Sequence, residues 1–302
     1  MYDVIIVGGG PAGLTAAVYA LRANKTVLVI EKAGFGGQIA FSPKVENIPG
    51  TILISGAEFG EKLIEQAMAL GADVELETVT RLQKEADIFT IFTEDGATFQ
   101  GKSVILALGV KHRTLGLPGE EELIGKGISF CAVCDGAFYA GQNTAMIGGG
   151  NSALQEALLL SEVCNHVTVV QNLADFTGEK KLSQALLEKE NVTVYFSTLV
   201  DGYLSDENGI TGLRLRNDIT GEISQLTVDG VFLAVGLMPE NEPFAEFVDL
   251  NNWGYFDVGE DCTTKTPGLF VAGDCRSKQI RQVTTAASDG AIAAMAACRY
   301  LD

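Results

Sequence analysis

Histidine is scarce in this chain, and most of its cysteines stand alone. The histidines are His112 and His166. Outside one Cys-x-x-Cys pair, the cysteines are scattered singly, at Cys164, Cys262, Cys275 and Cys298. A structural zinc site needs two pairs of Cys or His at ligand spacing, so Cys131 and Cys134 would form only half of one. We therefore favour a redox pair, which closes to a disulfide that can accept two electrons.

Positive charge is also scarce. Lys and Arg number 21 against 39 Asp and Glu, which gives a formal net charge of -18. No basic patch stands out, so nucleic acid and anionic membrane surfaces are not expected partners. No apolar run reaches the length of a membrane span, and Met1 leads into a strand-like segment rather than a signal peptide. We expect a soluble cytoplasmic protein, and in a reducing compartment a Cys-x-x-Cys pair is more often catalytic than structural.

Glycine, in contrast, is abundant. The chain has 302 residues, 35 of them glycine, and 47% of its residues are hydrophobic. That length and composition allow two domains with a sizeable core. Many of the glycines follow apolar strands, at the turns where nucleotide-binding folds need them.

The first glycine-rich turn lies close to the N-terminus. The apolar run Val4–Val7 predicts a buried parallel strand, and it is followed by Gly8-Gly9-Gly10-Pro11-Ala12-Gly13. A helical stretch from Leu14 to Asn24 and a second apolar strand ending at Glu31 come next. In this context the pattern is a dinucleotide-binding fingerprint. Helix amides would bind a pyrophosphate, and Glu31 would accept hydrogen bonds from ribose hydroxyls.

A second copy of this plan begins at Thr144–Ile147. It continues through Gly148-Gly149-Gly150-Asn151-Ser152-Ala153, a helix over Leu154–Val163 and a strand over Val167–Val170. The long interval between the copies predicts two nucleotide-type domains rather than a short-period repeat array. Other expected elements are a helix over 58–70, a hairpin around Glu94-Asp95-Gly96, a hairpin over 212–226, strands over 104–109, 228–236 and 269–274, and a helix over 284–301.

The Cys-x-x-Cys segment Cys131-Ala132-Val133-Cys134-Asp135-Gly136 stands directly before the second glycine turn. Together with Gly36-Gly37-Gln38, Glu46-Asn47, Gly273-Asp274 and Arg281-Gln282-Val283, it resembles the low-molecular-weight thioredoxin reductases, which are FAD-dependent disulfide oxidoreductases. The resemblance covers nearly the whole chain. It implies an α/β fold of two Rossmann-like nucleotide-binding domains, each of three ββα layers, and a homodimer. The FAD-binding domain would comprise residues 1–113 and 240–302, and the inserted nicotinamide-type domain, residues 114–239, would carry the cysteines.

The resemblance also implies roles for individual residues. Cys134 would face the flavin, Cys131 would attack the disulfide of thioredoxin, and Asp135 would be the acid/base. A helix N-cap is the alternative role for Asp135. Asp274 would bond the ribityl chain, and the backbone of Gln282 and Val283 would reach the isoalloxazine ring. The remaining expected FAD contacts are the first glycine turn with Glu31 and Lys32, then Gly37, Gln38, Asn47, Gly109 and Arg281.

The stretch after the second fingerprint departs from the family. In NADPH-using members a cluster of His and Arg holds the 2′-phosphate there, whereas residues 169–177 of this chain contain no arginine. Gln171 and Asn172 cannot neutralise a phosphate, and Asp175 would repel it. NADH would want an acid where Gln171 stands. Lys180 and Lys181 lie downstream in an expected new helix, as surface charges.

The sequence therefore predicts an FAD-dependent thioredoxin reductase that takes electrons from reduced ferredoxin, like the subgroup that lacks nicotinamide contacts. Lys111, His112 and Arg113 are a candidate docking cluster for the ferredoxin. One alternative is a conventional NADPH- or NADH-dependent enzyme with atypical contacts. A second is a ferredoxin–NADP reductase, which would lack both cysteines and keep the phosphate-binding arginines. The third is a flavin-binding redox sensor without turnover.

Overall fold

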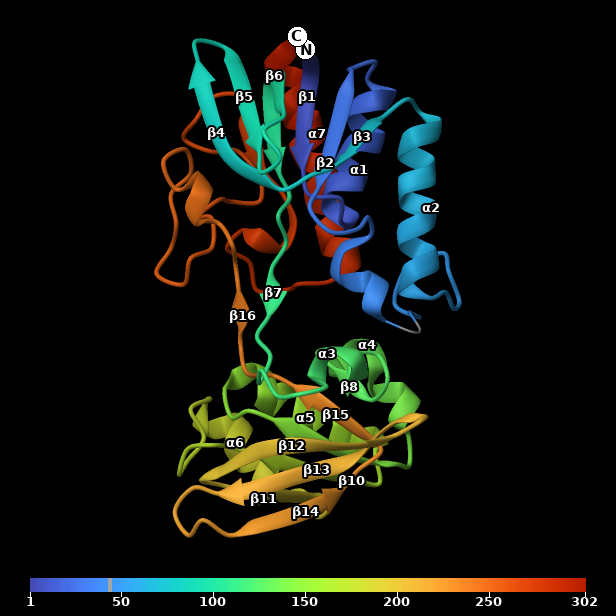
Figure 1. Cartoon of the computed structure of the whole chain (residues 1–302), viewed down its shortest axis with the longest axis vertical. Coiled ribbons are helices and arrows are strands. Elements are labelled where there is room, and N and C mark those ends of the chain that lie inside the picture. The colour runs from blue at the N-terminus through green and yellow to red at the C-terminus, as the bar shows by residue number, and fades with distance from the viewer. Residues whose placement is uncertain (43–44) are drawn as a thin grey trace. The chain divides into compact units, whose positions relative to one another are not determined.

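The computed structural model describes residues 1–42 and 45–302, which divide into two compact units. Unit 1 contains residues 1–40, 48–111 and 238–302, and unit 2 contains residues 41–47 and 112–237 (Figure 1). The long connections between the units run through β7 (Lys111–His112) and β16 (Leu237–Met238), which pair with each other.

Unit 1 is built on a mixed sheet in the order β3-β2-β1-β6-β5-β4, and β17 also pairs with β6. Strands β3, β2, β1, β6 and β17 are parallel, whereas β4 and β5 add to β6 as an antiparallel edge. The strands are β1 (Tyr2–Val7), β2 (Val27–Glu31), β3 (Asp73–Leu76), β4 (Val79–Glu85), β5 (Ile88–Thr93), β6 (Thr98–Leu106) and β17 (Leu269–Val271). The parallel strands read as continuous apolar runs because both of their faces are covered.

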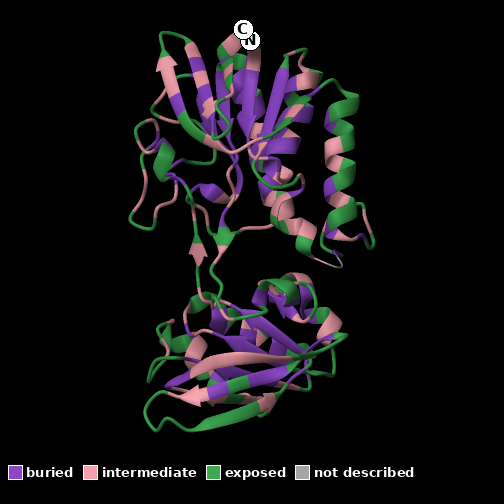
Figure 2. Cartoon of the chain, in the orientation of Figure 1, coloured by how far each residue is buried: buried purple, intermediate pink, exposed green. Residues whose placement is uncertain are grey.

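Helices cover one face of this sheet. Val4 and Ile6 pack with α1 (Pro11–Arg22) and α7 (Val283–Leu301), while Ile5 and Val7 pack on the opposite face against β5 and the segment 244–258. Figure 2 shows β1, β2, α1 and α7 largely buried and α2 (Gly56–Ala69) largely exposed. The short helices η1 (Gly37–Phe41), η3 (Glu242–Phe244) and η4 (Gly273–Cys275) complete the unit.

Unit 2 repeats the plan around a five-stranded parallel sheet in the order β11-β10-β9-β15-β8. One face packs against α5 and α6, and the other packs against an antiparallel layer of β12, β13 and β14. The helices are α3 (Glu120–Leu123), α4 (Ala132–Asp135), η2 (Gly136–Tyr139), α5 (Asn151–Val163) and α6 (Lys180–Leu187). The strands are β8 (Ile128–Ser129), β9 (Asn143–Ile147), β10 (His166–Val170), β11 (Val192–Tyr195), β12 (Thr198–Asp206), β13 (Gly209–Asn217), β14 (Ile223–Thr227) and β15 (Gly230–Leu233).

The predicted fold class is confirmed, because each unit is an α/β layer structure with a parallel nucleotide-binding sheet. Several strands were not predicted, β12 among them. The expected hairpin over 212–226 is the second and third strand of a three-stranded layer that begins with β12. Asp201 and Gly202 lower the strand propensity of β12, and the pairing is irregular between Val200 and Gly202.

A buried carboxylate fastens the start of unit 2. Glu120 is 3% exposed and accepts hydrogen bonds from the backbone amides of Leu115 (2.9 Å), Gly116 (2.6 Å) and Leu117 (3.1 Å). The hydroxyl of Tyr203 on β12 donates a further bond of 2.8 Å to it. One side chain therefore ties the connection after β7 to α3 and to the antiparallel layer.

Replacing Glu120 with Gln should destabilise the protein more than removing one of its partners. The amide of Gln would set an N–H₂ group against backbone N–H donors, so we expect a loss of about 3 kcal/mol or more in the free energy of unfolding. Tyr203→Phe removes a single bond to a charged group and should cost about 1.5–3 kcal/mol. Urea titrations followed by circular dichroism measure both. Equal losses in the two variants would contradict the role given to Glu120.

Candidate functional site

The glycine turn between β1 and α1 leaves the helix N-terminus open to an anion. Gly10 is the N-cap without a side-chain hydrogen bond, Pro11 begins the helix, and the first turn holds no acid. The turn is tight: Gly8 has φ +112°, and a Cβ on Gly13 would lie 1.9 Å from the Gly8 carbonyl oxygen. Because the first amides of a helix have no partner within it, they can bind a phosphate.

Glu31, at the end of β2, lies directly beside this turn. Its Oε2 accepts a 2.6 Å hydrogen bond from Gly9 N–H, and its Oε1 accepts one of 3.0 Å from Ala33 N–H. A carboxylate offers about four acceptor positions, so further hydroxyl donors can still bind. Lys32 has a different surrounding, because its ammonium pairs with Glu240.

Of the other expected cofactor residues, Gly37 lies against the same turn. Gly36 N–H donates to Gly9 O at 2.8 Å, and a Cβ on Gly37 would lie 3.1 Å from the Cα of Gly10. Gly109 follows β6, the strand next to β1. Gln38 and Asn47 are exposed, and Asn47 belongs to the segment 41–47 of unit 2. The roles of these residues toward FAD stay predictions.

Asp274, in η4, carries a buried acceptor. Its Oδ1 is buried and has no hydrogen-bond partner among the described residues, and the Lys278 ammonium lies 3.6 Å from it. Burial raises the pKa of Asp274, against the opposing influence of Lys278 and Arg281. Gly273 lies against Ala12 of the glycine turn, with a Cβ-to-Cβ separation of 2.8 Å if it carried a side chain. The Asp274 Oδ1, which accepts no hydrogen bond from the described residues, is therefore on a segment next to the turn and can accept one from a hydroxyl group.

A buried charge network holds Asp274 from behind. The guanidinium of Arg276 binds both carboxylate oxygens of Asp289 at 2.8 Å, and Lys278 Nζ donates to Asp289 Oδ2 at 3.0 Å. The same Oδ2 accepts the Gly273 N–H at 3.0 Å. Arg276, Asp289 and Lys278 are each more than nine-tenths buried. Two acids and two bases thus balance, and their bonds fix the backbone on which Asp274 stands.

Arg281 and Gln282 lead into α7. Arg281 Nε donates to Asp274 O at 3.4 Å, and its guanidinium stacks over the Tyr255 ring at 4.3 Å. Gln282 is the N-cap, and its N–H donates to Thr285 Oγ1 at 3.1 Å. The Gln282 side chain also accepts the Thr285 backbone N–H in a capping box, so the amides that remain at this helix start belong to Val283 and Thr284.

These features fit FAD. The α1 amides match a pyrophosphate, Glu31 matches ribose hydroxyls, and the unpaired Oδ1 of Asp274 matches a further hydroxyl. A neutralised network behind Asp274 keeps that carboxylate available without leaving excess buried charge.

The redox pair lies in unit 2. Cys131 and Cys134 form a disulfide with Cα atoms 5.3 Å apart, at the start of α4. Cys131 is the N-cap of this helix, and its Sγ accepts the Cys134 N–H at 3.2 Å. Both cysteines are half-buried, and Val133 between them is exposed. Because Cys131 and Cys134 are joined in a disulfide, they form a redox pair rather than half of a zinc site.

Asp135 is joined to the redox turn through Ser129. Ser129 Oγ donates to Asp135 Oδ2 at 2.6 Å and accepts the Cys131 N–H at 3.1 Å. Asp135 Oδ1 is buried and has no hydrogen-bond partner within the described residues. Burial raises the pKa of Asp135, while the bond from Ser129 acts to lower it. Asp135 ends α4 and stands at the N-cap position of η2, but its side chain makes no capping hydrogen bond there.

Lys111, His112 and Arg113, the candidate docking cluster, do not form a patch of three free cations. Lys111 Nζ pairs with Glu240 Oε1 at 2.7 Å. His112 stacks on Phe130 with ring centroids 4.6 Å apart, and burial lowers its pKa to about 4. Its imidazole is therefore neutral at pH 7. Lys111 and Arg113 are both exposed, and within the described residues Arg113 is the one cation of the three without an ion pair.

The second glycine turn lies against Gln171, in the place that Glu31 has beside the first. Gln171 is 2% exposed, and its Nε2 donates to Asp175 O at 3.0 Å, so its side chain closes on its own loop. The Thr177 and Gly178 amides both donate to Gly149 O. Asn151 Oδ1, at the start of α5, accepts the Glu179 N–H at 2.7 Å. Residues 171–179 bring the acids Asp175 and Glu179 and no cation to this turn.

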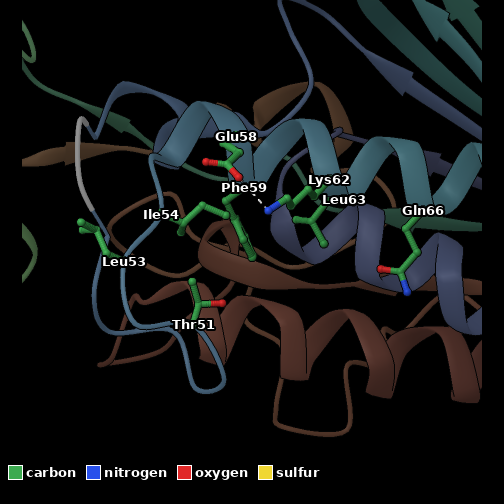
Figure 3. Close-up of a pocket in the computed structure, with 8 residues that line it drawn as sticks. All are labelled: Thr51, Leu53, Ile54, Glu58, Phe59, Lys62, Leu63 and Gln66. Carbon is green, nitrogen blue, oxygen red and sulfur yellow. Dashed lines mark hydrogen bonds and ion pairs between the residues drawn. The ribbon is translucent and has the colours of Figure 1, made fainter.

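A surface pocket of about 250 Å³ opens elsewhere in unit 1 (Figure 3). It lies beside α2, where Lys62 bonds Glu58 at 2.7 Å, and it is lined by Thr51, Leu53, Ile54, Glu58, Phe59, Lys62, Leu63 and Gln66. It contains none of the expected site residues. In the described part of the chain, no three metal-ligating side chains cluster, and no helix is long and apolar enough to span a bilayer.

Comparison with known proteins places these sites in a family. A sequence model of the family described as pyridine nucleotide-disulphide oxidoreductase matches residues 2–290. The chain is 40% identical over 302 residues to thioredoxin reductase of Treponema pallidum (strain Nichols), covering 100% of this chain and 97% of that protein. It is 39% identical over 300 residues to the 34.2 kDa protein in rubredoxin operon of Clostridium pasteurianum, covering 99% and 97%. The crystal structure of thioredoxin reductase from Streptococcus pyogenes MGAS5005 superposes with TM-score 0.94 at 36% identity, covering 100% and 98%.

A nucleotide turn flanked by acids, together with a Cys-x-x-Cys disulfide, defines a flavoprotein disulfide oxidoreductase. Within this class, the chain belongs to the low-molecular-weight thioredoxin reductase family, which depends on FAD. The predicted family and enzyme class are therefore confirmed. The redox disulfide argues against the ferredoxin–NADP reductase alternative, which would lack both cysteines.

Sequence reasoning missed several residues that surround these sites. Ser129 and Glu156 bond residues of the redox turn, whereas Arg276, Lys278 and Asp289 form the charge network behind Asp274. For these residues the sequence offered one signal: a charged residue inside an apolar helix, such as Asp289 in the Ala-rich α7, is expected to be buried with a partner.

Breaking the network behind Asp274 should weaken both the fold and FAD binding. Asp289→Asn leaves Arg276 buried without a counter-charge and leaves Lys278 with Asp274 alone, 3.6 Å away, so we expect a loss of about 3–5 kcal/mol in unfolding free energy of the apoprotein. Asp249→Asn is the matched control, because its partner Lys265 is exposed and the pair should contribute at most about 1 kcal/mol. Denaturant titration and FAD titration by flavin fluorescence measure the two effects. Unchanged stability in Asp289→Asn would refute the network's role.

Proposed function

We propose that this thioredoxin reductase receives electrons from reduced ferredoxin rather than from NADPH, and passes them through Cys131 and Cys134 to thioredoxin. Thioredoxin as the partner follows from the family and from the names of the relatives. A homodimer is inferred from family membership alone. The observation that carries the choice of donor is the loop of residues 171–179, which offers no cation beside the second glycine turn.

The electrostatics of that loop disfavour a 2′-phosphate. Such a phosphate carries close to two negative charges and binds well only to charge-assisted donors such as arginine. Here Asp175 and Glu179 add negative charge, and Gln171 already bonds its own loop. Losing two charge-assisted bonds of about 1.5–3 kcal/mol each weakens binding by about two to four decades. NADH fares no better, because Gln171 stands where an acid would bind the ribose.

The chain's own residues divide the work of the reaction. The α1 amides, Glu31 and Asp274 would hold FAD, and bound FAD accepts electrons singly or in pairs and passes two to a disulfide. Cys134 would receive these electrons as the sulfur on the flavin side. Cys131 would attack the disulfide of thioredoxin as a thiolate. Asp135 would move protons to and from the dithiol, because burial raises its pKa and so makes it a better proton carrier than an exposed carboxyl.

The electron donor can be identified by anaerobic mixing of the holoenzyme with NADPH, NADH or pre-reduced ferredoxin. We expect the flavin absorbance to bleach quickly with ferredoxin alone, and thioredoxin to be reduced afterwards. Fast bleaching by NADPH would overturn the proposal and establish a conventional enzyme with atypical contacts. Bleaching by ferredoxin without any reduction of thioredoxin would instead favour the redox-sensor alternative.

Restoring cations should restore NADP⁺ binding. Asn172 and Leu173 are exposed on the loop, so the double variant Asn172→Arg, Leu173→Arg should fold normally. Two new charge-assisted bonds should tighten NADP⁺ binding by about two to four decades, as measured by titration calorimetry. NAD⁺, which lacks the 2′-phosphate, should gain nothing in the same variant. Tight NADP⁺ binding by the unmodified protein would show that the loop is not the obstacle.

The two cysteine variants should differ in whether they form a stable mixed disulfide with thioredoxin. Cys134→Ser leaves Cys131 free to form a stable mixed disulfide with thioredoxin, because no second thiol can resolve it. Cys131→Ser should form none, although both variants should lose turnover. Non-reducing gels make the comparison, with a thioredoxin whose second cysteine is replaced and whose remaining thiol is activated as the mixed disulfide with thionitrobenzoate, the leaving group that the attacking thiolate displaces. A mixed disulfide that forms in Cys131→Ser and not in Cys134→Ser would reverse the assignment.

A further inference from the structure

Glu156 reaches the redox turn from a neighbouring helix. It lies in the second turn of α5, and its Oε2 accepts the backbone N–H of Ala132 at 3.1 Å. Ala132 is the residue directly after Cys131 and the first residue of α4. The amide before it, on Cys131, is bound by Ser129, which donates in turn to Asp135. Carboxylates therefore hold the two amides on either side of Cys131, one directly and one through a hydroxyl.

This arrangement differs from what activates a cysteine at a helix start. Free amides and the helix dipole stabilise a thiolate and lower the pKa of the thiol. A carboxylate bonded to such an amide has the opposite effect, because its negative charge opposes a second negative charge nearby. Stabilising the thiolate makes a disulfide more oxidising, so opposing the thiolate makes the dithiol a stronger reductant.

We propose that Glu156 is a positioning residue that holds the Ala132 amide and opposes ionisation of Cys131, so that the reduced pair gives its electrons up readily to thioredoxin. In the reductive step the S–S bond breaks, two electrons arrive from the flavin, and each sulfur either takes a proton from solvent or remains a thiolate. Glu156 disfavours the thiolate product at Cys131. It touches neither sulfur in the disulfide form and acts through the turn.

The surroundings of Glu156 make this influence depend on pH. Burial raises the pKa of Glu156 to about 7, and the Ala132 amide acts in the opposite direction. The elements packed against α5 are α4, η2, α6, β9 and β10, and their titratable groups are Cys134, Asp135, Tyr139, Lys180, Lys181 and His166. Glu156 is therefore largely neutral below about pH 6 and ionised above about pH 8, where the effect on Cys131 is expected.

The test compares Glu156→Gln with the unmodified holoenzyme from pH 6 to pH 9. Glu162→Gln is the matched control, because Glu162 lies on the same helix and pairs with Lys189 at the surface. The pKa of the Cys131 thiol is read from alkylation of the reduced enzyme, with peptide mass spectrometry to identify the cysteine. The disulfide potential is read from equilibration with glutathione buffers at each pH.

In Glu156→Gln we expect the thiol pKa of Cys131 to fall by roughly one unit, a tenfold gain in thiolate. Below about pH 6 the potentials of variant and parent should coincide, whereas at pH 9 the variant should be more oxidising by about tenfold in equilibrium constant, or about 30 mV. A purely structural role would shift the potential equally at all pH values, and that result would refute the proposal. Equal potentials at pH 9, or the same shift in Glu162→Gln, would also refute it.

A second measurement does not depend on the dithiol chemistry. Because the pKa of Glu156 is raised on folding, the folded protein binds the Glu156 proton between about pH 4.5 and pH 7 more tightly than the unfolded chain. This contribution to stability is present at low pH and is lost as the pH rises through 7. The thermal midpoint of the parent should therefore fall over that interval relative to Glu156→Gln. If Glu156→Gln does not fold, Glu156→Asp replaces it in the test, because its shorter carboxylate reaches Ala132 less well. Above pH 8 the disulfide of Glu156→Asp should be more oxidising than that of the parent, by less than tenfold in equilibrium constant. Equal potentials of Glu156→Asp and the parent above pH 8 would refute the proposal.

Discussion

Carboxylates that accept hydrogen bonds from backbone amides recur wherever this chain turns tightly near a functional group. Glu31 holds Gly9, Asp289 holds Gly273, and Glu120 holds the connection into unit 2. A carboxylate that leaves water needs such donors or a cation, and an amide at a turn has no strand or helix partner. Each pairing satisfies two groups that would otherwise be costly to bury. The acidic composition of the chain is therefore partly structural.

The two glycine turns show how little of a nucleotide site lies in the turn itself. Both follow a parallel strand and open a helix whose N-cap is a glycine. Around the first, Glu31 keeps acceptor positions and Asp274 keeps a buried oxygen that accepts no hydrogen bond from the described residues. Beside the second, Gln171 is bonded to its own loop and no cation stands between residues 171 and 179. These neighbours are the reason why the donor is proposed to be ferredoxin.

At the redox turn, the same kind of pairing acts on chemistry. Asp135 and Glu156 are both carboxyls whose pKa is raised by burial. Glu156 accepts the Ala132 amide directly, and Asp135 is linked to the Cys131 amide through the Ser129 hydroxyl. A thiolate at a helix start would ordinarily profit from those amides. Because the Cys131 and Ala132 amides already have hydrogen-bond acceptors, they do not stabilise the thiolate, and the reduced Cys131–Cys134 pair is suited to donating electrons to a partner.

The sequence by itself determined the fold class, the family, both glycine turns and the Cys131–Cys134 pair, because each of these depends on local patterns: apolar runs, turn glycines and a short spacing. Glu31 could be placed beside Gly8–Gly13 for the same reason. Tertiary structure alone decided that Asp135 bonds Ser129, that Glu156 reaches Ala132, and that Asp289 neutralises Arg276 and Lys278. It also decided that His112 stacks on Phe130 and that Lys111 pairs with Glu240, which removed the expected cationic patch. These outcomes depend on which side chains meet after distant strands and helices pack, and burial then sets their charge, so no local pattern contains them.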